Sequence, residues 1–218
     1  MKRSSLALAL ALFCLPALAQ SDPTVTVDFS NPGLVPPRWT LVLHPDGHAH
    51  FHSERGEITP NLMQTIAPVA IDRDVTLTAD YTSHVFDVVR RHRLMNEDCE
   101  SHLKVAFQGT KRIAYSGPEG FGACQFNYAK NKEIQSLGES FVAVSGTIIE
   151  GARLELLLQH DPLGLDREMQ FLKEAVQDGR LQQMSVIQGI LTKLEDDPGV
   201  MERVRRSARL LLAESAAK

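Results

Sequence analysis

The stretch "RWTLVLHPDGHAHFHSE", residues 38–54, decides the fold of the first half of the chain. The turn sequence PDG at 45–47 stands between two runs in which apolar and polar residues alternate, which is typical of a β-hairpin with a three-residue loop. Because the turn fixes the register, the cross-strand neighbours can be predicted residue by residue. The predicted pairs are Leu43 with Ala49, Val42 with His50, Leu41 with Phe51 and Thr40 with His52.

This register divides the hairpin into two faces, because successive side chains of a strand point to opposite sides. The apolar face carries Trp39, Leu41, Leu43, Ala49 and Phe51. The other face carries Thr40, Val42, His44, His48, His50 and His52. A shift by one residue would scatter the apolar side chains over both faces. We therefore expect the apolar face to be buried and the four histidines to lie outside.

The four histidines allow two interpretations. Residues two apart on a strand point the same way, and directly opposed residues bring their Cβ atoms to about 5 Å. His44, His48 and His50, with His52 beside them, could therefore converge on a zinc or copper ion. The other interpretation is that solvent-facing hairpin positions tolerate histidine without any function. We prefer the second interpretation and keep the metal site as an alternative hypothesis.

The first 19 residues have the three-part pattern of a secretory signal peptide. Two cations precede an apolar run at 6–15, and small residues at 17 and 19 predict cleavage after Ala19. The apolar run is too short to cross a hydrocarbon core of about 30 Å. We therefore expect export to the periplasm or the cell exterior, with a mature chain of residues 20–218 that has no transmembrane segment.

Composition and motifs exclude several classes of function. The chain has a net charge of −4, and loss of the signal would remove two further cations. An acidic chain is a poor non-specific ligand of nucleic acid, so no such partner is expected. The glycine-rich stretch at 115–124 lacks the lysine and the following helix of a phosphate-binding loop. The sequence also lacks the G-x-S-x-G motif of a nucleophile elbow, and we predict no catalytic residue and no organic cofactor.

Two cysteines, Cys99 and Cys124, remain once Cys14 leaves with the signal. An even pair in an oxidising compartment is typical of a structural disulfide. A bridge that closes a loop of about 25 residues contributes roughly 3 kcal/mol on the chain-entropy model. We therefore predict a Cys99–Cys124 disulfide.

The hydrophobic period changes along the chain, which predicts an α+β fold. Residues 20–130 are mainly β, in a small antiparallel sheet, and residues 131–218 are mainly α, with about four helices. Both parts are assigned to a single domain, 20–218, with one hydrophobic core. In the first half we expect strands at 24–29, 75–81 and 123–128, a hairpin about Gly109-Thr110 within 103–117, and helices at 59–66 and 83–95. In the second half, residues 141–149 fit a helix but leave a strand as an alternative. Asp166 and the pair Asp197-Pro198 are expected to open the later helices.

These observations predict an exported, non-enzymatic protein that binds another protein or a small ligand. The alternative is a metal-binding protein or metalloenzyme that uses the histidines of the hairpin.

Overall fold

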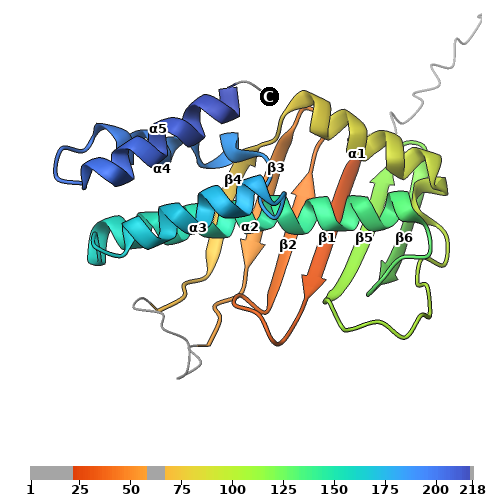
Figure 1. The fold of residues 1–218 in the computed structure, drawn as a ribbon. Helices are drawn as coiled ribbons and strands as arrows, with labels where there is room; N and C mark the ends of the chain where they lie inside the picture. The colour runs from red at the N-terminus through yellow and green to blue at the C-terminus, as the bar shows by residue number, and fades with distance from the viewer. Residues whose placement is uncertain (1–21, 58–66, 217–218) are drawn as a thin grey trace, which may run out of the picture.

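The computed structural model describes residues 22–57 and 67–216. It confirms the α+β fold, with a six-stranded antiparallel sheet in the first half of the chain and helices in the second (Figure 1). The strand order across the sheet is β4-β3-β2-β1-β5-β6, so β4 and β6 form its edges. The strands are β1 (Thr24–Ser30), β2 (Arg38–Leu43), β3 (His48–Ser53), β4 (Ile71–Thr76), β5 (Thr110–Gly117) and β6 (Gly120–Phe126).

Helices cover one face of this sheet and then continue beyond it (Figure 1). The long helix α2 crosses the strands from the β6 side and passes β4, where the last three helices pack beside its second half. The helices are α1 (Ala79–Arg91), α2 (Lys132–His160), α3 (Leu165–Gln177), α4 (Gln188–Asp196) and α5 (Glu202–Ala216), with short 3₁₀ turns η1 (Arg93–Met95) and η2 (Met184–Ile187).

The predicted hairpin is confirmed, including its register. Leu43 pairs with Ala49, Leu41 with Phe51 and Thr40 with His52. The five side chains of the predicted apolar face are all buried against the helices. The sheet thus has a core face under α1 and α2 and an opposite face on which the histidines lie.

The buried apolar residues form two clusters, so the expectation of one hydrophobic core is too simple. The first cluster joins the sheet to α1 and the first part of α2. The second joins the end of α2, from Leu154 on, to α3, α4 and α5. Helix α2 belongs to both, and Val186 packs against both. One long helix therefore connects the sheet layer to the helical lobe.

Two predicted strands are wrong in their bounds. The strand expected at 75–81 lies at 71–76, because the Thr78 side chain accepts a hydrogen bond from the Tyr81 N–H and starts α1 at Ala79. The hairpin expected about Gly109-Thr110 is also wrong. β5 begins at Thr110 and turns into β6 at Gly120, whose φ is +133°. Since β1 and β6 occupy both sides of β5, the sheet has no place beside β5 for residues 103–108.

Residues 141–149 are helical, which settles the alternative left open by the sequence. Their β-branched side chains face buried surroundings, and tertiary packing here outweighs local propensity. The glycines of α2 allow close approach of another segment: a Cβ at Gly151 would lie 2.3 Å from the Cγ2 of Ile187. Helix α2 is therefore continuous, although the β-branched residues and glycines in its sequence disfavour a helix.

The other helix ends differ from the predictions by a few residues. The predicted helix at 83–95 starts earlier and ends at Arg91, followed by η1. Gly164, not Asp166, is the N-cap of α3, and Asp166 instead pairs with Arg203 of α5 at 2.6 Å. The last helix begins at Glu202 rather than at Asp197-Pro198. These cap predictions are wrong because Asp166 lies in the first turn of α3, whereas Asp197 is the C-cap of α4 and its side chain accepts from the Gly199 N–H at 2.8 Å.

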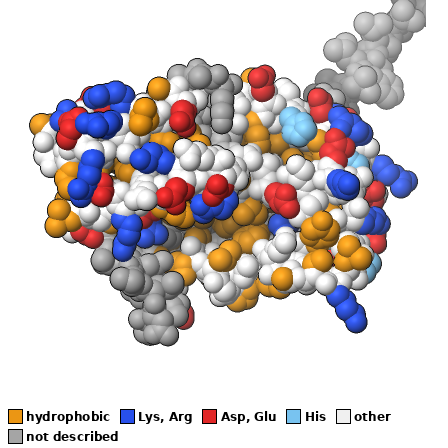
Figure 2. Space-filling view, in the orientation of Figure 1, with side chains coloured by type: hydrophobic (Ala, Val, Ile, Leu, Met, Phe, Trp, Pro, Cys, Tyr) orange, Lys and Arg blue, Asp and Glu red, His pale blue; other side chains and the backbone are white. Residues whose placement is uncertain are grey.

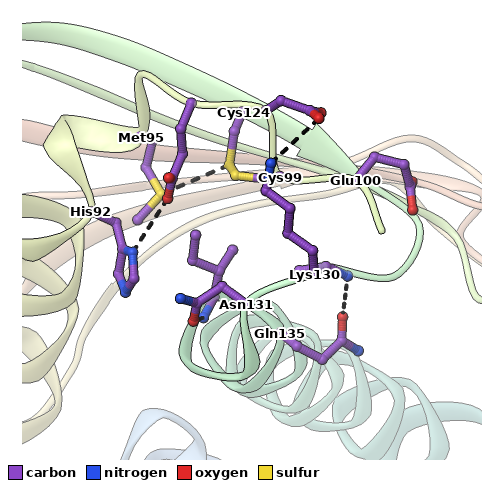
Figure 3. Close-up of a disulfide and its surroundings, with 12 residues drawn as sticks. His92, Met95, Cys99, Glu100, Cys124, Lys130, Asn131 and Gln135 are labelled. Carbon is purple, nitrogen blue, oxygen red and sulfur yellow. Dashed lines mark hydrogen bonds and ion pairs between the residues drawn. A yellow bond between two sulfur atoms is a disulfide. The ribbon is translucent and has the colours of Figure 1, made fainter. Parts of the chain in front are cut away.

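The Cys99–Cys124 disulfide is present and joins the connection after α1 to β6 (Figure 3). Its Cα atoms are 5.7 Å apart, and the Sδ of Met95 lies 3.8 Å from the Sγ of Cys124. The predicted signal peptide and the predicted helix at 59–66 lie outside the described residues. Within the described ranges, no helix combines the length and apolarity that a membrane crossing needs.

Candidate functional site

The structure places the four histidines on the uncovered face of the sheet, as the sequence predicts. We call this group the histidine face: His44, His48, His50 and His52. The side chains of the last three are 50%, 42% and 54% exposed. The rings of His44 and His48 lie side by side across the end of the hairpin, with centroids 5.9 Å apart.

Two aspartates that sequence reasoning missed are the main partners of these rings. β4 pairs with β3 and brings Asp74 opposite His50 and Asp72 opposite His52. The His50 Nδ1 lies 2.9 Å from Asp74, and the His52 Nδ1 lies 2.9 Å from Asp72. The second nitrogen of His50 is 3.6 Å from Asp72. The missed signal is the alternation in "IDRDVT", which becomes visible only once the strand is placed at 71–76.

The pairing changes the acid–base properties of one His–Asp pair. The hydrogen bond from Asp74 raises the pKa of His50, and burial opposes this only weakly. The same bond, with His50 as partner, lowers the pKa of Asp74. The pair therefore favours the imidazolium form of His50 together with the carboxylate form of Asp74.

The next strands continue this pattern of paired charges across the sheet. Thr40 donates to one carboxylate oxygen of Asp28 at 2.9 Å, and the Arg112 Nη1 donates to the other at 3.2 Å. Arg38 lies 3.6 Å from Glu54 at the end of the hairpin. On the uncovered face each of these carboxylates thus lies beside a histidine or an arginine.

The geometry gives no preformed metal centre. Within residues 22–57 and 67–216, no three His, Cys, Asp or Glu side chains are placed to hold one ion. Carboxylates already occupy the Nδ1 atoms of His50 and His52. The zinc or copper site stays a prediction.

A second candidate site is an apolar cavity of about 90 Å³ between the sheet edge and α2. Its walls come from the connector after β1, the residues that lead into β4, and the middle of α2. The apolar residues that line it are Val35, Pro36, Ala67, Pro68, Val69, Ile71, Ile149, Ala152, Leu156 and Leu157. Two polar side chains, Glu150 and Arg153, complete the lining.

These two polar side chains belong to a buried cluster with Glu168 of α3. Glu168 is 4% exposed, and its carboxylate accepts from the Arg153 Nε at 2.9 Å. Glu150 shares a hydrogen bond with Glu168. The Oε2 atom of Glu150 is buried and has no hydrogen-bond partner within the described part of the chain. One acceptor at the cavity is therefore left without a donor.

The cluster holds a proton near neutral pH. Burial raises the pKa of Glu150 to about 8, and the charge of Glu168 and the shared hydrogen bond act in the same direction. Arg153 opposes this shift. At pH 7 Glu150 is therefore mainly a neutral acid, and the Arg153 guanidinium pairs with the carboxylate of Glu168. The free oxygen of Glu150 can accept a hydrogen bond from a ligand.

Arg203, Arg205 and Arg209 of α5 make contacts within the helical lobe. Arg209 lies 2.8 Å from Glu195 of α4, and Arg205 donates to the main-chain oxygen of Glu195 at 3.0 Å. Together with the Arg203–Asp166 pair, these contacts fasten α5 to its neighbours.

Comparison with known proteins adds no relative. No family model matches the chain, and no curated protein matches it.

Proposed function

We propose that the protein is an exported binding protein that takes a small amphipathic ligand in the cavity beside α2. The observation that carries the proposal is a cavity with mainly apolar walls whose lining residue Glu150 has a buried Oε2 without a hydrogen-bond partner among the described residues. Binding sites for small molecules are typically apolar pockets with a few polar groups that fix orientation, and a perturbed pKa often marks them. The Cys99–Cys124 disulfide supports export, because such bonds persist in oxidising compartments.

The cavity limits the size of the ligand. An apolar protein cavity of about 150 Å³ holds benzene. A cavity of about 90 Å³ therefore holds an apolar group on the order of four non-hydrogen atoms, such as a branched alkyl group. For a ligand this small, we expect a dissociation constant of about 1 mM.

The polar cluster limits the chemistry of the head group. A buried acceptor gains most from a ligand that offers an N–H or O–H donor, because leaving such an atom unpaired costs about 1–3 kcal/mol. A carboxylate would instead meet the side chain of Glu150, and the Arg153 guanidinium in the lining is already paired with Glu168. We therefore infer that the ligand is a small amine, alcohol or amide rather than an acid.

Isobutylamine, isobutanol and isovalerate test this inference, since they share one alkyl group and differ in the head. We expect the amine and the alcohol to shift the amide resonances of α2 around Ile149 and Leu157 in a saturable way, and isovalerate to leave them unchanged. Glu150→Leu removes the acceptor, so this variant should no longer prefer the amine and the alcohol over isovalerate. Ala152→Leu fills the cavity and should abolish binding.

Ala143→Leu is the matched control, because Ala143 lies on the same helix, is equally buried at 5% exposure and does not line the cavity. This variant should bind like the unchanged protein. The absence of saturable shifts with the amine and the alcohol, or equal binding by the Ala152→Leu variant, would contradict the proposal.

The alternative function, metal binding at the histidine face, has one observation in its favour. In metal sites, a carboxylate that holds one nitrogen of a histidine commonly orients the other toward the ion. Asp72 and Asp74 hold the Nδ1 atoms of His52 and His50 in this way. Metal analysis of untagged protein tests the alternative: one equivalent of zinc or copper, lost in the His48→Gln/His50→Gln variant, would support it, and less than that would reject it.

A further inference from the structure

Exposed apolar side chains are concentrated at one end of the sheet. Nine large apolar side chains are exposed among the described residues, and five of them lie in loops at this end: Leu34, Val69, Leu103, Val105 and Phe107. These loops are residues 31–37 between β1 and β2, residues 67–70 before β4, and residues 102–109 before β5. We call the three stretches together the apolar end. Figure 2 shows apolar side chains gathered at the side of the molecule where Figure 1 has the connection into β5.

The sheet register and two packing contacts place the three stretches side by side. The last residue of β1 pairs with the first residue of β2 and with the first residue of β5. A Cβ at Gly109 would lie 3.3 Å from the Cβ of Asn31, so the connection into β5 touches the connector after β1. Val35 of this connector and Val69 line the same cavity beside α2. The apolar end is therefore one surface, at the opposite end of the strands from the hairpin turn.

The connection into β5 is held in a defined conformation, although residues 102–108 are all exposed. Within it, the Val105 N–H donates to the Leu103 oxygen at 2.9 Å. The side chain of Asn127, just after β6, accepts from the Gln108 N–H at 2.7 Å and donates to the Ala106 oxygen at 3.2 Å. The fold thus holds this loop in place while its large apolar side chains remain in solvent.

The apolar end carries little charge, and that charge is positive. Its three stretches contain no acidic residue, and their ionisable residues are His102 and Lys104. The neighbouring residues 54–57 add one arginine and two glutamates, of which Glu54 lies 3.6 Å from Arg38. These groups together have a small positive net charge, although the whole chain has a net charge of −4. This charge is complementary to that of anionic lipid head groups.

We propose that the apolar end attaches the protein to the surface of a lipid bilayer. Large exposed apolar patches mark interaction sites with proteins or membranes. Five side chains exposed to this degree offer roughly 500 Å² of apolar surface. Each partner in a stable protein interface buries about 800 Å², so the patch is small for a protein partner or a second copy. A bilayer needs no surface of matching shape, and apolar side chains that enter it leave Lys104 at the level of the head groups.

The small number of inserted side chains sets the strength of attachment. A single myristoyl chain binds a membrane marginally and reversibly, with a constant of about 10⁴ M⁻¹. The apolar end offers apolar surface of a similar order. We therefore expect reversible attachment with a partition constant on the order of 10⁴ M⁻¹.

Flotation of the disulfide-bonded protein with vesicles of phosphatidylglycerol or of phosphatidylcholine tests the proposal. The protein is used without residues 1–19, because the apolar run at 6–15 would bind vesicles by itself. We expect binding to both lipids, and Phe107→Ser should lower the partition constant about tenfold because a large apolar side chain is lost. Lys104→Glu should lower it about tenfold on phosphatidylglycerol and leave it unchanged on phosphatidylcholine.

Phe121→Ser is the matched control, since Phe121 is 84% exposed and lies on β6 beside the turn at the opposite end of the sheet. This variant should bind like the unchanged protein, and both phenylalanine variants should keep its circular dichroism spectrum. No flotation with either lipid, or equal losses in the Phe107→Ser and Phe121→Ser variants, would overturn the proposal. A dimer that sedimentation detects without vesicles, and that Phe107→Ser abolishes, would assign the apolar end to a second copy and would also overturn it.

Discussion

The histidine face and the group formed by Glu150, Arg153 and Glu168, which we call the Glu150 cluster, both pair a basic side chain with a carboxylate. The first lies in solvent and the second is largely buried. On the sheet, His50 and Asp74 are paired at 2.9 Å, with side chains 42% and 66% exposed. Between α2 and α3, Arg153 and Glu168 are also paired at 2.9 Å, but the glutamate side chain is only 5% exposed. Two ion pairs of the same length can therefore contribute different free energies to folding. Water solvates each charged group on the sheet, whereas between the helices other protein groups must stabilise the charge.

Loss of one partner has different consequences at the two places. An exposed ion pair contributes about 0–1 kcal/mol, because water solvates whichever charge is left. Removal of one member of a buried pair costs about 3–5 kcal/mol, because the other charge remains buried without compensation. In the Glu150 cluster, Glu168 is paired with Arg153 and lies beside the carboxyl of Glu150, whose pKa is raised. The stability of the helical lobe should thus depend on Arg153 and on the protonation of Glu150.

The largest expected effect breaks the buried pair. Arg153→Met should lower the free energy of unfolding by about 1–3 kcal/mol at pH 7, because the buried Glu168 then loses its cation, whereas the 36% exposure of the Arg153 side chain lets water screen part of the pair. Urea denaturation measures this change. The matched exposed variant is Arg112→Met, which leaves Asp28 on the sheet and should cost less than about 1 kcal/mol. Equal losses in the two variants would show that the two regions do not differ.

The second effect concerns the proton of Glu150. In the folded protein its pKa is about 8, against an ordinary value of 4.5. Between these values the folded state holds a proton that the unfolded chain has released, so stability is complete below the lower value and falls as the pH rises. The slope is about 1.4 kcal/mol per pH unit. Glu150→Gln imitates the protonated acid and should remove this slope from urea midpoints measured between pH 5 and 8.5.

A contrary result would be informative. If the unchanged protein and the Glu150→Gln variant show parallel pH profiles, Glu150 is ionised in the folded state. The acceptor that we assign to the cavity would then carry a charge, and the ligand would have to be a cation.

Sequence reasoning located the exposed region better than the buried one. The hairpin could be predicted because turn chemistry and period-two alternation are local and agree with each other. The partners of its histidines were missed, since Asp72 and Asp74 become recognisable only when the bounds of β4 are known, and these depend on the Thr78 cap of the next helix.

The buried cluster could not be assembled from sequence for a different reason. Glu150 interrupts an apolar stretch of α2, which is a visible signal, but its partner Glu168 lies on the next helix and faces it only after the two helices pack. Residues 103–108 are the converse case. Their alternation predicted a strand, and this prediction is wrong because β5 already has β1 and β6 as neighbours, which only the topology shows.

The smallest expected effect lies on the histidine face. The pKa of His50 is raised by Asp74, so this pair adds stability that is complete below the ordinary value of 6.5 and is lost as the pH rises through the folded value. Because the pair is exposed, the change in unfolding free energy should be too small to resolve with urea. A nitrogen-15 NMR titration resolves it directly. Asp74→Asn should move the midpoint of His50 down toward 6.5. If the midpoint of His50 does not move, Asp74 is not the partner of His50 in solution, and another group raises the pKa of His50.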